Sequence, residues 1–142
     1  MNERAQSLGM ANTHFVNATG LDAQGHVTTA RDIAEMSRVL LRYPLISEYS
    51  SVWMSELRGG ETQLVNTNKL VRFYDGCTGL KTGTTDGAGS CLSASATRGG
   101  LSLVAVTLGS ATSAERFSAA RGLLDYGFAH YARVALPVVE GL

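Results

Sequence analysis

The sequence lacks several features, and each absence argues against a class of protein. No apolar run approaches the about 20 residues needed to cross a bilayer, and the start, Met1-Asn2-Glu3-Arg4, lacks the apolar stretch of a secretory signal. The net charge is zero, with 12 basic and 12 acidic side chains, so no positive excess favours a nucleic acid as partner. Taken alone, these features predict a soluble, cytoplasmic protein.

Cysteine is scarce as well, with two residues in the chain. Cys77 and Cys91 form no Cys-x-x-Cys pair, and His14, His26 and His130 have no ligand spacing, so we expect no metal and no cofactor. If the residues between the cysteines form a hairpin, the two thiols lie at different distances from its turn. That arrangement predicts free thiols rather than a disulfide.

The chain has the length and the hydrophobic content, 142 residues and 44%, of one domain with a buried core. Its patterns predict, in chain order, a helix over 2–8 ended by Gly9, a helix opened by Thr29-Ala30-Arg31-Asp32 and closed by Pro44, a hairpin of 51–57 and 61–66, a helical turn over 67–73, strands at 78–83, 90–97 and 101–108, and a helix from the capping box Thr112-Ser113-Ala114-Glu115 to about residue 130. Short connections between the strands imply an antiparallel sheet with helices packed on it. The predicted fold class is therefore α+β.

Alternation and helical spacing predict which side chains face the core. In the second of the three strands, Leu92, Ala94 and Ala96 point inward, whereas Ser90, Ser93 and Ser95 line the outer face. The apolar face of the last helix consists of Phe117, Ala120, Leu123, Leu124, Phe128 and Tyr131.

The most informative stretch contains Lys81-Thr82-Gly83, followed by Thr84, Thr85 and a Gly-rich turn over 86–89. Three interpretations are open. The lysine and the threonine hydroxyls form one wall of a catalytic cleft that holds a carboxylate and supports proton transfer; the glycines form a phosphate loop; or the run is a plain hairpin turn. The phosphate loop is the weakest, because neither GxxxxGK[ST] nor GxGxxG occurs. For an isolated Lys-Thr-Gly, the plain turn is the commonest interpretation.

The surroundings of this stretch favour the catalytic interpretation. Across nearly its whole length the chain resembles the D-alanyl-D-alanine carboxypeptidases, the low-molecular-mass penicillin-binding proteins of the serine peptidase type. The segments that carry the resemblance are Asn12-Thr13-His14-Phe15, Thr19-Gly20-Leu21-Asp22, Thr28-Thr29-Ala30-Arg31-Asp32, Asn66-Thr67-Asn68-Lys69-Leu70, Gly79-Leu80-Lys81-Thr82-Gly83-Thr84-Thr85, Ala88-Gly89, Thr112-Ser113, Arg116-Phe117 and Leu123-Leu124-Asp125-Tyr126-Gly127-Phe128. Each segment is weak evidence alone, but their common order and spacing are specific.

The resemblance implies a partial β-lactamase/transpeptidase-like fold and a role for each residue of the motif. The family uses Ser-x-x-Lys, Ser-x-Asn and Lys-Thr-Gly, and its serine attacks the D-Ala-D-Ala peptide bond to form an acyl-enzyme that water hydrolyses. By resemblance, Lys81 is the catalytic lysine of the third motif. Thr82, Gly83 and Thr84 bind substrate, with the Thr84 N–H as an oxyanion donor. The implied ligands are the peptidoglycan stem peptide and, in the intact enzyme, β-lactams.

Two of the three family motifs are absent. The residues three before the two lysines are Asn66 and Thr78, and no serine lies two before an asparagine. We therefore expect residues 1–142 to be the C-terminal portion of the transpeptidase-like domain, without its nucleophile half, and to be inactive alone. The alternative is a non-catalytic module that binds peptidoglycan peptides or a protein; a related β-lactamase or esterase is more remote.

The predicted truncation has two further consequences. The strand at 101–108 is expected to have an unpaired edge, which predicts a homodimer or a complementing N-terminal half. Because the family acts outside the cytoplasmic membrane, the parent protein is placed in the cell envelope, although this chain has no signal or membrane segment.

Other polar residues have simpler interpretations. Asp22 and Asp32 are predicted as turn and capping residues. Arg116 is predicted to pair with Glu115 or Asp125, with a substrate role as the less favoured alternative.

Overall fold

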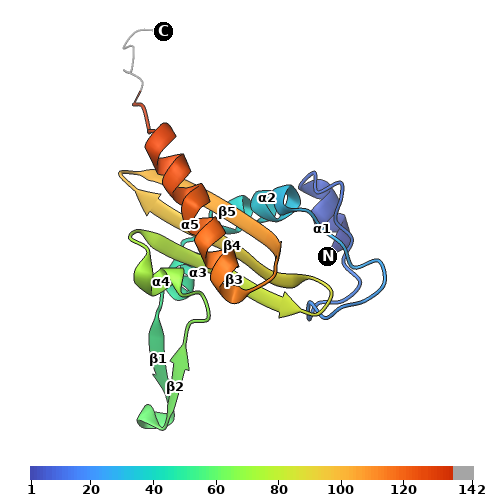
Figure 1. Cartoon of the computed structure of the whole chain (residues 1–142), viewed down its shortest axis with the longest axis horizontal. Coiled ribbons are helices and arrows are strands. Elements are labelled where there is room, and N and C mark those ends of the chain that lie inside the picture. Colours follow the sequence, from blue (N-terminus) through green and yellow to red (C-terminus); the bar gives the residue numbers. More distant parts are fainter. Residues whose placement is uncertain (136–142) are drawn as a thin grey trace.

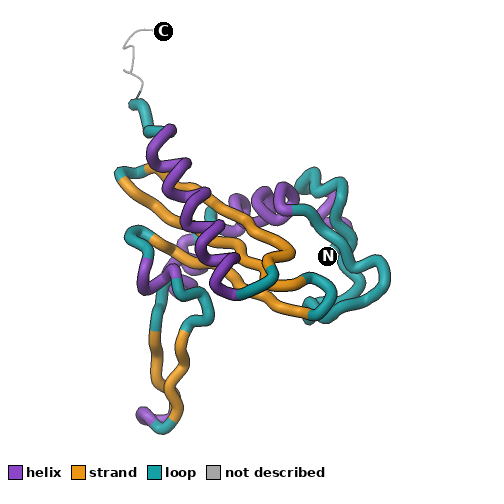
Figure 2. Tube along the Cα trace, in the orientation of Figure 1, coloured by secondary structure: helices purple, strands orange, loops and turns teal. Residues whose placement is uncertain are grey.

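The computed structural model describes residues 1–135, so residues 136–142 of the predicted domain portion lie outside the described residues. The elements are α1 (Asn2–Ser7), α2 (Ala30–Leu40), α3 (Pro44–Ser50), β1 (Met54–Leu57), the short 3-10 helix η1 (Arg58–Gly60), β2 (Thr62–Val65), α4 (Leu70–Phe73), β3 (Cys77–Thr85), β4 (Gly89–Arg98), β5 (Leu101–Ser110) and α5 (Ser113–His130). The fold is α+β, as the sequence predicted (Figure 1). A two-stranded hairpin, β1 and β2, projects from the main body (Figure 2).

The main sheet is antiparallel with the strand order β3-β4-β5. Its central strand places Leu92, Ala94 and Ala96 in the core, each at most 1% exposed. Helix α5 covers this face (Figure 1), and its Ala120 and Leu124 belong to the same buried cluster. The predicted inward alternation of the second strand is therefore confirmed.

The two longer helices begin where their N-terminal side chains satisfy free backbone N–H groups. The Thr29 hydroxyl accepts a hydrogen bond from the Asp32 N–H at 3.2 Å, and the Thr112 hydroxyl accepts one from the Glu115 N–H at 3.2 Å. The Glu115 carboxylate accepts from the Ala111 N–H at 3.1 Å, one residue before the usual capping-box partner. Both predicted helix starts are confirmed.

The prediction that Ser90, Ser93 and Ser95 line an outer face is wrong, because all three are buried. The sheet is covered on its second face as well. Ser93 shares a hydrogen bond of 2.8 Å with Ser37 of α2, and Ser95 shares one of 2.8 Å with Thr78. Small hydroxyl side chains let a second layer approach the strand while each buried oxygen keeps a partner.

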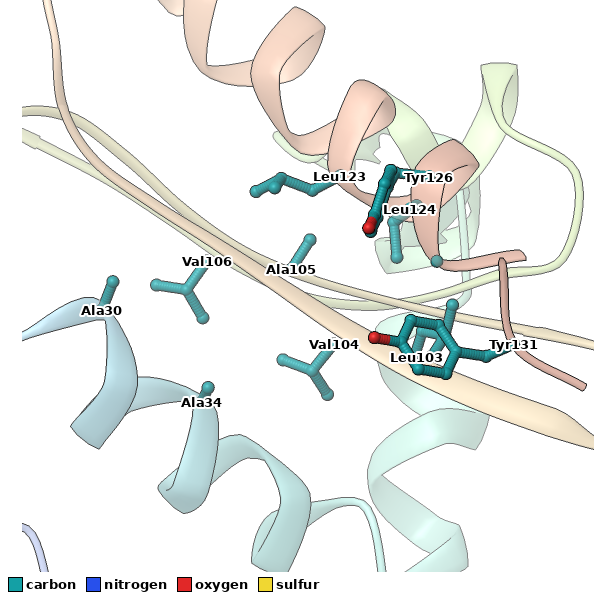
Figure 3. A pocket seen from close by; sticks show the side chains of 11 residues that line it. Ala30, Ala34, Leu103, Val104, Ala105, Val106, Leu123, Leu124, Tyr126 and Tyr131 are labelled. Carbon is teal, nitrogen blue, oxygen red and sulfur yellow. The ribbon is translucent and has the colours of Figure 1, made fainter. Parts of the chain in front are cut away.

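Two helix predictions also need correction. Pro44 does not close the second helix, which ends at Leu40; it begins α3, where a missing N–H costs nothing in the first turn. In the last helix, Leu123 and Tyr131 are 51% and 62% exposed. Leu123 lies beside β5, the outer strand, and not in the buried contact between α5 and the sheet (Figure 3). Tyr131 follows the last residue of α5.

The two cysteines are free, as predicted. In the β3–β4 register Cys77 lies opposite Ala96, whereas Cys91 lies opposite Gly83, so the thiols do not face each other. Burial raises the pKa of the Cys77 thiol, which makes it a poor nucleophile.

The prediction that Asp32 is a capping residue is wrong, because the Thr29 side chain caps α2; Asp32 instead joins the N-terminal loop to this helix. Its carboxylate accepts hydrogen bonds from the Thr13 hydroxyl at 2.7 Å and the Asn12 N–H at 2.9 Å. The Thr13 hydroxyl in particular lowers the pKa of Asp32 below its ordinary value of 3.8. The folded state thus favours the ionised form, so this stabilisation is present above pH 3.8 and lost as the pH falls through the lower, folded-state pKa.

We expect Asp32→Asn to reduce the free energy of unfolding at pH 7, because a neutral amide accepts these hydrogen bonds more weakly. The difference from the unchanged chain should shrink below about pH 4, where the aspartate itself becomes protonated. Urea unfolding at pH 7 and pH 3 measures both values, with the exposed Asp86→Asn as control. A deficit of the same size at both pH values would contradict this account.

Candidate functional site

The strand that carries the Lys-Thr-Gly motif is an edge strand. Within residues 1–135, β3 pairs with β4 alone. Alternate N–H and C=O groups along its other side are therefore available to side chains or to an extended ligand.

The register separates the motif residues between two faces of the sheet. Lys81 lies opposite Ser93, on the face of α2, and Gly83 shares that face by alternation. Thr82 and Thr84 lie on the face of α5, because Thr82 is opposite the core residue Leu92. The lysine and the threonine hydroxyls therefore converge only around the free edge of β3.

Lys81 is an exposed cation at this edge. Its ammonium donates a hydrogen bond to the Thr82 carbonyl oxygen. The ion pairs among the described residues, Arg38–Glu35 and Arg98–Asp75, do not include it. The lysine charge therefore remains available to an anionic group in front of the strand.

Gly83 leaves open space beside Lys81. A Cβ built at this position meets no atom within 4 Å, and its φ lies outside the left-handed region that favours glycine. Neither backbone conformation nor packing within the described residues requires glycine there. The residue therefore leaves bare backbone that a ligand can approach.

Thr82 is almost fully buried, with 7% of its surface exposed. Its hydroxyl shares a hydrogen bond of 2.7 Å with the hydroxyl of Thr67, which lies between β2 and α4. The side chain is therefore held by a group that precedes it by 15 residues.

Arg116 differs most from its sequence prediction. Its side chain forms no ion pair with Glu115 or Asp125. Its Nη1 instead donates hydrogen bonds to the Gly83 carbonyl and to the Thr84 hydroxyl, each at 3.0 Å. A third contact, at 3.3 Å, reaches the Cys91 carbonyl of β4. The residue is 7% exposed, and its buried Nε has no hydrogen-bond partner. A second cation thus lies directly behind the motif.

Asp22 fixes the turn that follows the motif. It accepts hydrogen bonds from the Thr85 hydroxyl at 2.6 Å and the Gly87 N–H at 2.9 Å. The Thr85 hydroxyl and then the Gly87 N–H hold the pKa of Asp22 below its ordinary value. The predicted turn residue therefore also joins the loop before α2 to the β3–β4 hairpin.

Within the described part of the chain, no three His, Cys, Asp or Glu side chains lie close enough to hold a metal ion. His26 has a structural role instead: its Nδ1 accepts hydrogen bonds from the Val16 N–H at 3.2 Å and the Asn17 N–H at 3.4 Å. The same residues, 1–135, contain no helix with the length and apolar character of a membrane span.

We expect Arg116→Met to lower the free energy of unfolding by about 1.5 kcal/mol, because three oxygens lose a charged donor while the apolar stem is kept. Chemical denaturation measures the change. Arg31→Met, at an exposed position of α2, is the matched control and should have a smaller effect. Equal losses from the two variants would contradict the contacts described for Arg116.

The family model of peptidase S11, described as D-alanyl-D-alanine carboxypeptidase, matches residues 1–112. The D-alanyl-D-alanine carboxypeptidase DacF of Bacillus subtilis is 41% identical over 134 residues, which cover 92% of this chain and 34% of that protein. DacC of Escherichia coli, with the same described activity, is 38% identical over 135 residues, covering 94% of this chain and 34% of that protein.

Solved structures resemble the fold of this chain closely. Penicillin-binding protein D2 from Listeria monocytogenes, in its cefotaxime-bound form, aligns with a TM-score of 0.80 and 36% identity over 89% of this chain and 53% of that chain. A Streptomyces DD-transpeptidase aligns with a TM-score of 0.81 and 29% identity over 90% of this chain and 52% of that chain. The chain thus spans about a third of its matched relatives and about half of these solved chains. It belongs to the peptidase S11 family of D-alanyl-D-alanine carboxypeptidases.

Proposed function

We propose that this chain supplies the Lys-Thr-Gly wall of a serine-type D-Ala-D-Ala carboxypeptidase, which trims the terminal D-alanine from peptidoglycan stem peptides. The observation that carries the proposal is the cationic, open edge of β3. Lys81 is exposed in front of the strand, Gly83 leaves room beside it, and Arg116 lies behind it. This set of groups suits a ligand that is extended and ends in a carboxylate.

Each motif residue has a separate part in the proposed binding. The Thr82 hydroxyl donates a hydrogen bond to the C-terminal carboxylate of the peptide. The positive charges of Lys81 and Arg116 stabilise the negative charge of that carboxylate. The peptide backbone lies along the free edge of β3, next to Gly83. This assignment extends the sequence prediction by giving Arg116 an electrostatic role.

The chemical step needs a nucleophile that these 142 residues do not contain in its family motif. We propose that a segment with Ser-x-x-Lys supplies the serine. Its oxygen attacks the carbonyl carbon between the two D-alanines, the hydroxyl proton passes to the departing amine, and D-alanine leaves from the acyl-enzyme. Water then hydrolyses the ester. Lys81 supports the proton transfers through its positive charge, and the Thr84 N–H stabilises the oxyanion.

β-Lactams are the proposed inhibitors of the complete site. Penicillin-binding protein D2 from Listeria monocytogenes has been solved in cefotaxime-bound and ampicillin-bound forms. A β-lactam offers a strained amide and a carboxylate, the two groups that the proposed serine and the β3 edge would meet.

Incubation with a fluorescent penicillin tests whether the nucleophile lies outside this chain. We expect no covalent label on the isolated chain, and stoichiometric labelling of the protein that also carries the Ser-x-x-Lys segment. Lys81→Ala in that longer protein should slow labelling by at least about tenfold, because a positioned acid–base group contributes about 10²–10⁴ to such steps. Lys69→Ala, the chain's other lysine, is the control. Stoichiometric labelling of the isolated chain would contradict the proposal.

We also propose that the segment carrying Ser-x-x-Lys docks on the outer edge of β5, which has no strand partner within residues 1–135. Apolar side chains surround this edge on both faces. Figure 3 shows Val104 and Val106 pointing toward α2, while Ala105 lies toward Leu124 of α5. Together with residues of both helices they line a hollow of about 340 Å³. A strand added here would extend the ladder and cover these side chains.

In the absence of that segment, we expect the exposed β5 edge to make the isolated chain self-associate. Val104→Lys should reduce this association, because a charge among the apolar side chains opposes burial. Light scattering over a range of concentrations measures it, with Leu64→Lys on the projecting hairpin as control, since Leu64 is 48% exposed but far from the β5 edge. The docking surface would be contradicted by a chain that stays monomeric at every concentration and whose β5 amides are protected from hydrogen exchange.

A non-catalytic binding module is the second candidate, and the absence of Ser-x-x-Lys from the sequence favours it for the chain by itself. It shares the carboxylate-binding edge but needs no added segment. Peptide binding without penicillin labelling of any longer form of the protein would support it. For the parent enzyme we propose a location in the cell envelope, where peptidoglycan is the substrate.

A further inference from the structure

The segment Asn66-Thr67-Asn68 lies beside the free edge of β3, although the proposed reaction gives it no part. Asn68 is 1% exposed, and its side-chain amide donates to the Gly79 carbonyl of β3 at 2.9 Å. Three residues further along β3, the Thr67 and Thr82 hydroxyls are 2.7 Å apart. The segment therefore contacts the strand on both sides of Lys81.

The two asparagines hold the segment in place. The Asn66 amide donates to the carbonyls of Ser50 and Val52 at 3.1 and 3.0 Å, and its oxygen accepts from the Asn68 N–H at 2.9 Å. The Asn68 oxygen accepts from the Leu70 N–H at 3.1 Å. Thr67 thus lies between two amide side chains that are both hydrogen-bonded to backbone groups.

The proton between the two threonine hydroxyls has a preferred direction once a ligand is present. Only one of the two oxygens donates along their contact. A carboxylate accepts hydrogen bonds and donates none. If Thr82 is to donate to the carboxylate, its oxygen must accept from Thr67, and Thr67 must supply the proton of the contact.

We propose that Thr67 is a positioning residue that donates to Thr82 and thereby directs the Thr82 proton toward the ligand carboxylate. The inference deepens the proposed function and rests on it. It concerns one hydroxyl: the fold of segment 66–68 depends on the asparagines, whereas Thr67 determines how Thr82 presents its donor.

The ligand-free chain tests the first half of the inference. We expect Thr67→Val to change the side-chain couplings of Thr82 measured by NMR from a single χ1 rotamer to an average of rotamers, and Thr67→Ser to restore the single rotamer. Thr62→Val, an exposed position of β2, is the matched control. A single Thr82 rotamer in Thr67→Val would overturn the inference without any use of a ligand.

Two probe peptides test the second half: one ending in D-alanyl-D-alanine with a free carboxylate, and the same peptide as the C-terminal amide. We expect Thr67→Val to weaken binding of the carboxylate peptide by about fivefold, the equivalent of one ordinary hydrogen bond. Thr67→Ser should bind as the unchanged chain does. Binding of the amide peptide should be weaker and insensitive to Thr67.

The outcomes separate this inference from the proposed function. An unchanged chain that prefers the carboxylate peptide, together with a Thr67→Val variant of equal affinity, overturns the role of Thr67 alone. Equal weakening of both peptides indicates a general structural effect and also overturns it. Failure of the unchanged chain to distinguish the peptides contradicts the proposed carboxylate site, and the Thr82 couplings then decide separately whether Thr67 orders that hydroxyl.

Discussion

The site depends on the way in which β3, an edge strand, is held. Its inner side pairs with β4, whereas side chains support its other groups. Ser50 donates to the Thr78 carbonyl at 2.5 Å and Asn68 donates to the Gly79 carbonyl, while Arg116 links β3 to β4 through the carbonyls of Gly83 and Cys91. Because these donors are side chains rather than a neighbouring strand, the start of β3 is held in place and yet part of its edge stays open. That combination gives the Lys-Thr-Gly motif a defined position beside accessible backbone.

Much of the fold follows from local patterns in the sequence. Alternation predicted the core side of β4, and the hydroxyl–acid spacing at Thr29 and Thr112 predicted two helix starts, because both signals arise within one element. The second covered face of the sheet was not predictable in this way. Ser93 and Ser95 look like outer residues until α2 and Thr78 are placed against them, and that contact spans 56 residues for Ser93.

The site shows the same division between local and distant information. The motif itself is contiguous, so its residues could be identified directly. Arg116 could not be assigned, because its nearest acidic neighbours in sequence suggested ion pairs, whereas the folded chain brings it 32 and 33 residues back to Thr84 and Gly83. The two-sided arrangement of Lys81 and Thr82 likewise follows from the strand register. Asn66-Thr67-Asn68 was visible as a resemblance, but only the folded chain shows what it touches.

The side-chain contacts at Thr78 and Gly79 also set the footprint of an extended ligand. They occupy the beginning of the β3 edge, so a peptide can form main-chain hydrogen bonds only from Leu80 onward, and the strand ends at Thr85. Because outward-facing groups alternate along a strand, this leaves contacts at roughly every second residue. An extended ligand at this edge is therefore limited to a short span of main-chain contacts. The same donors that hold the start of β3 thus limit the stretch of its edge that remains open.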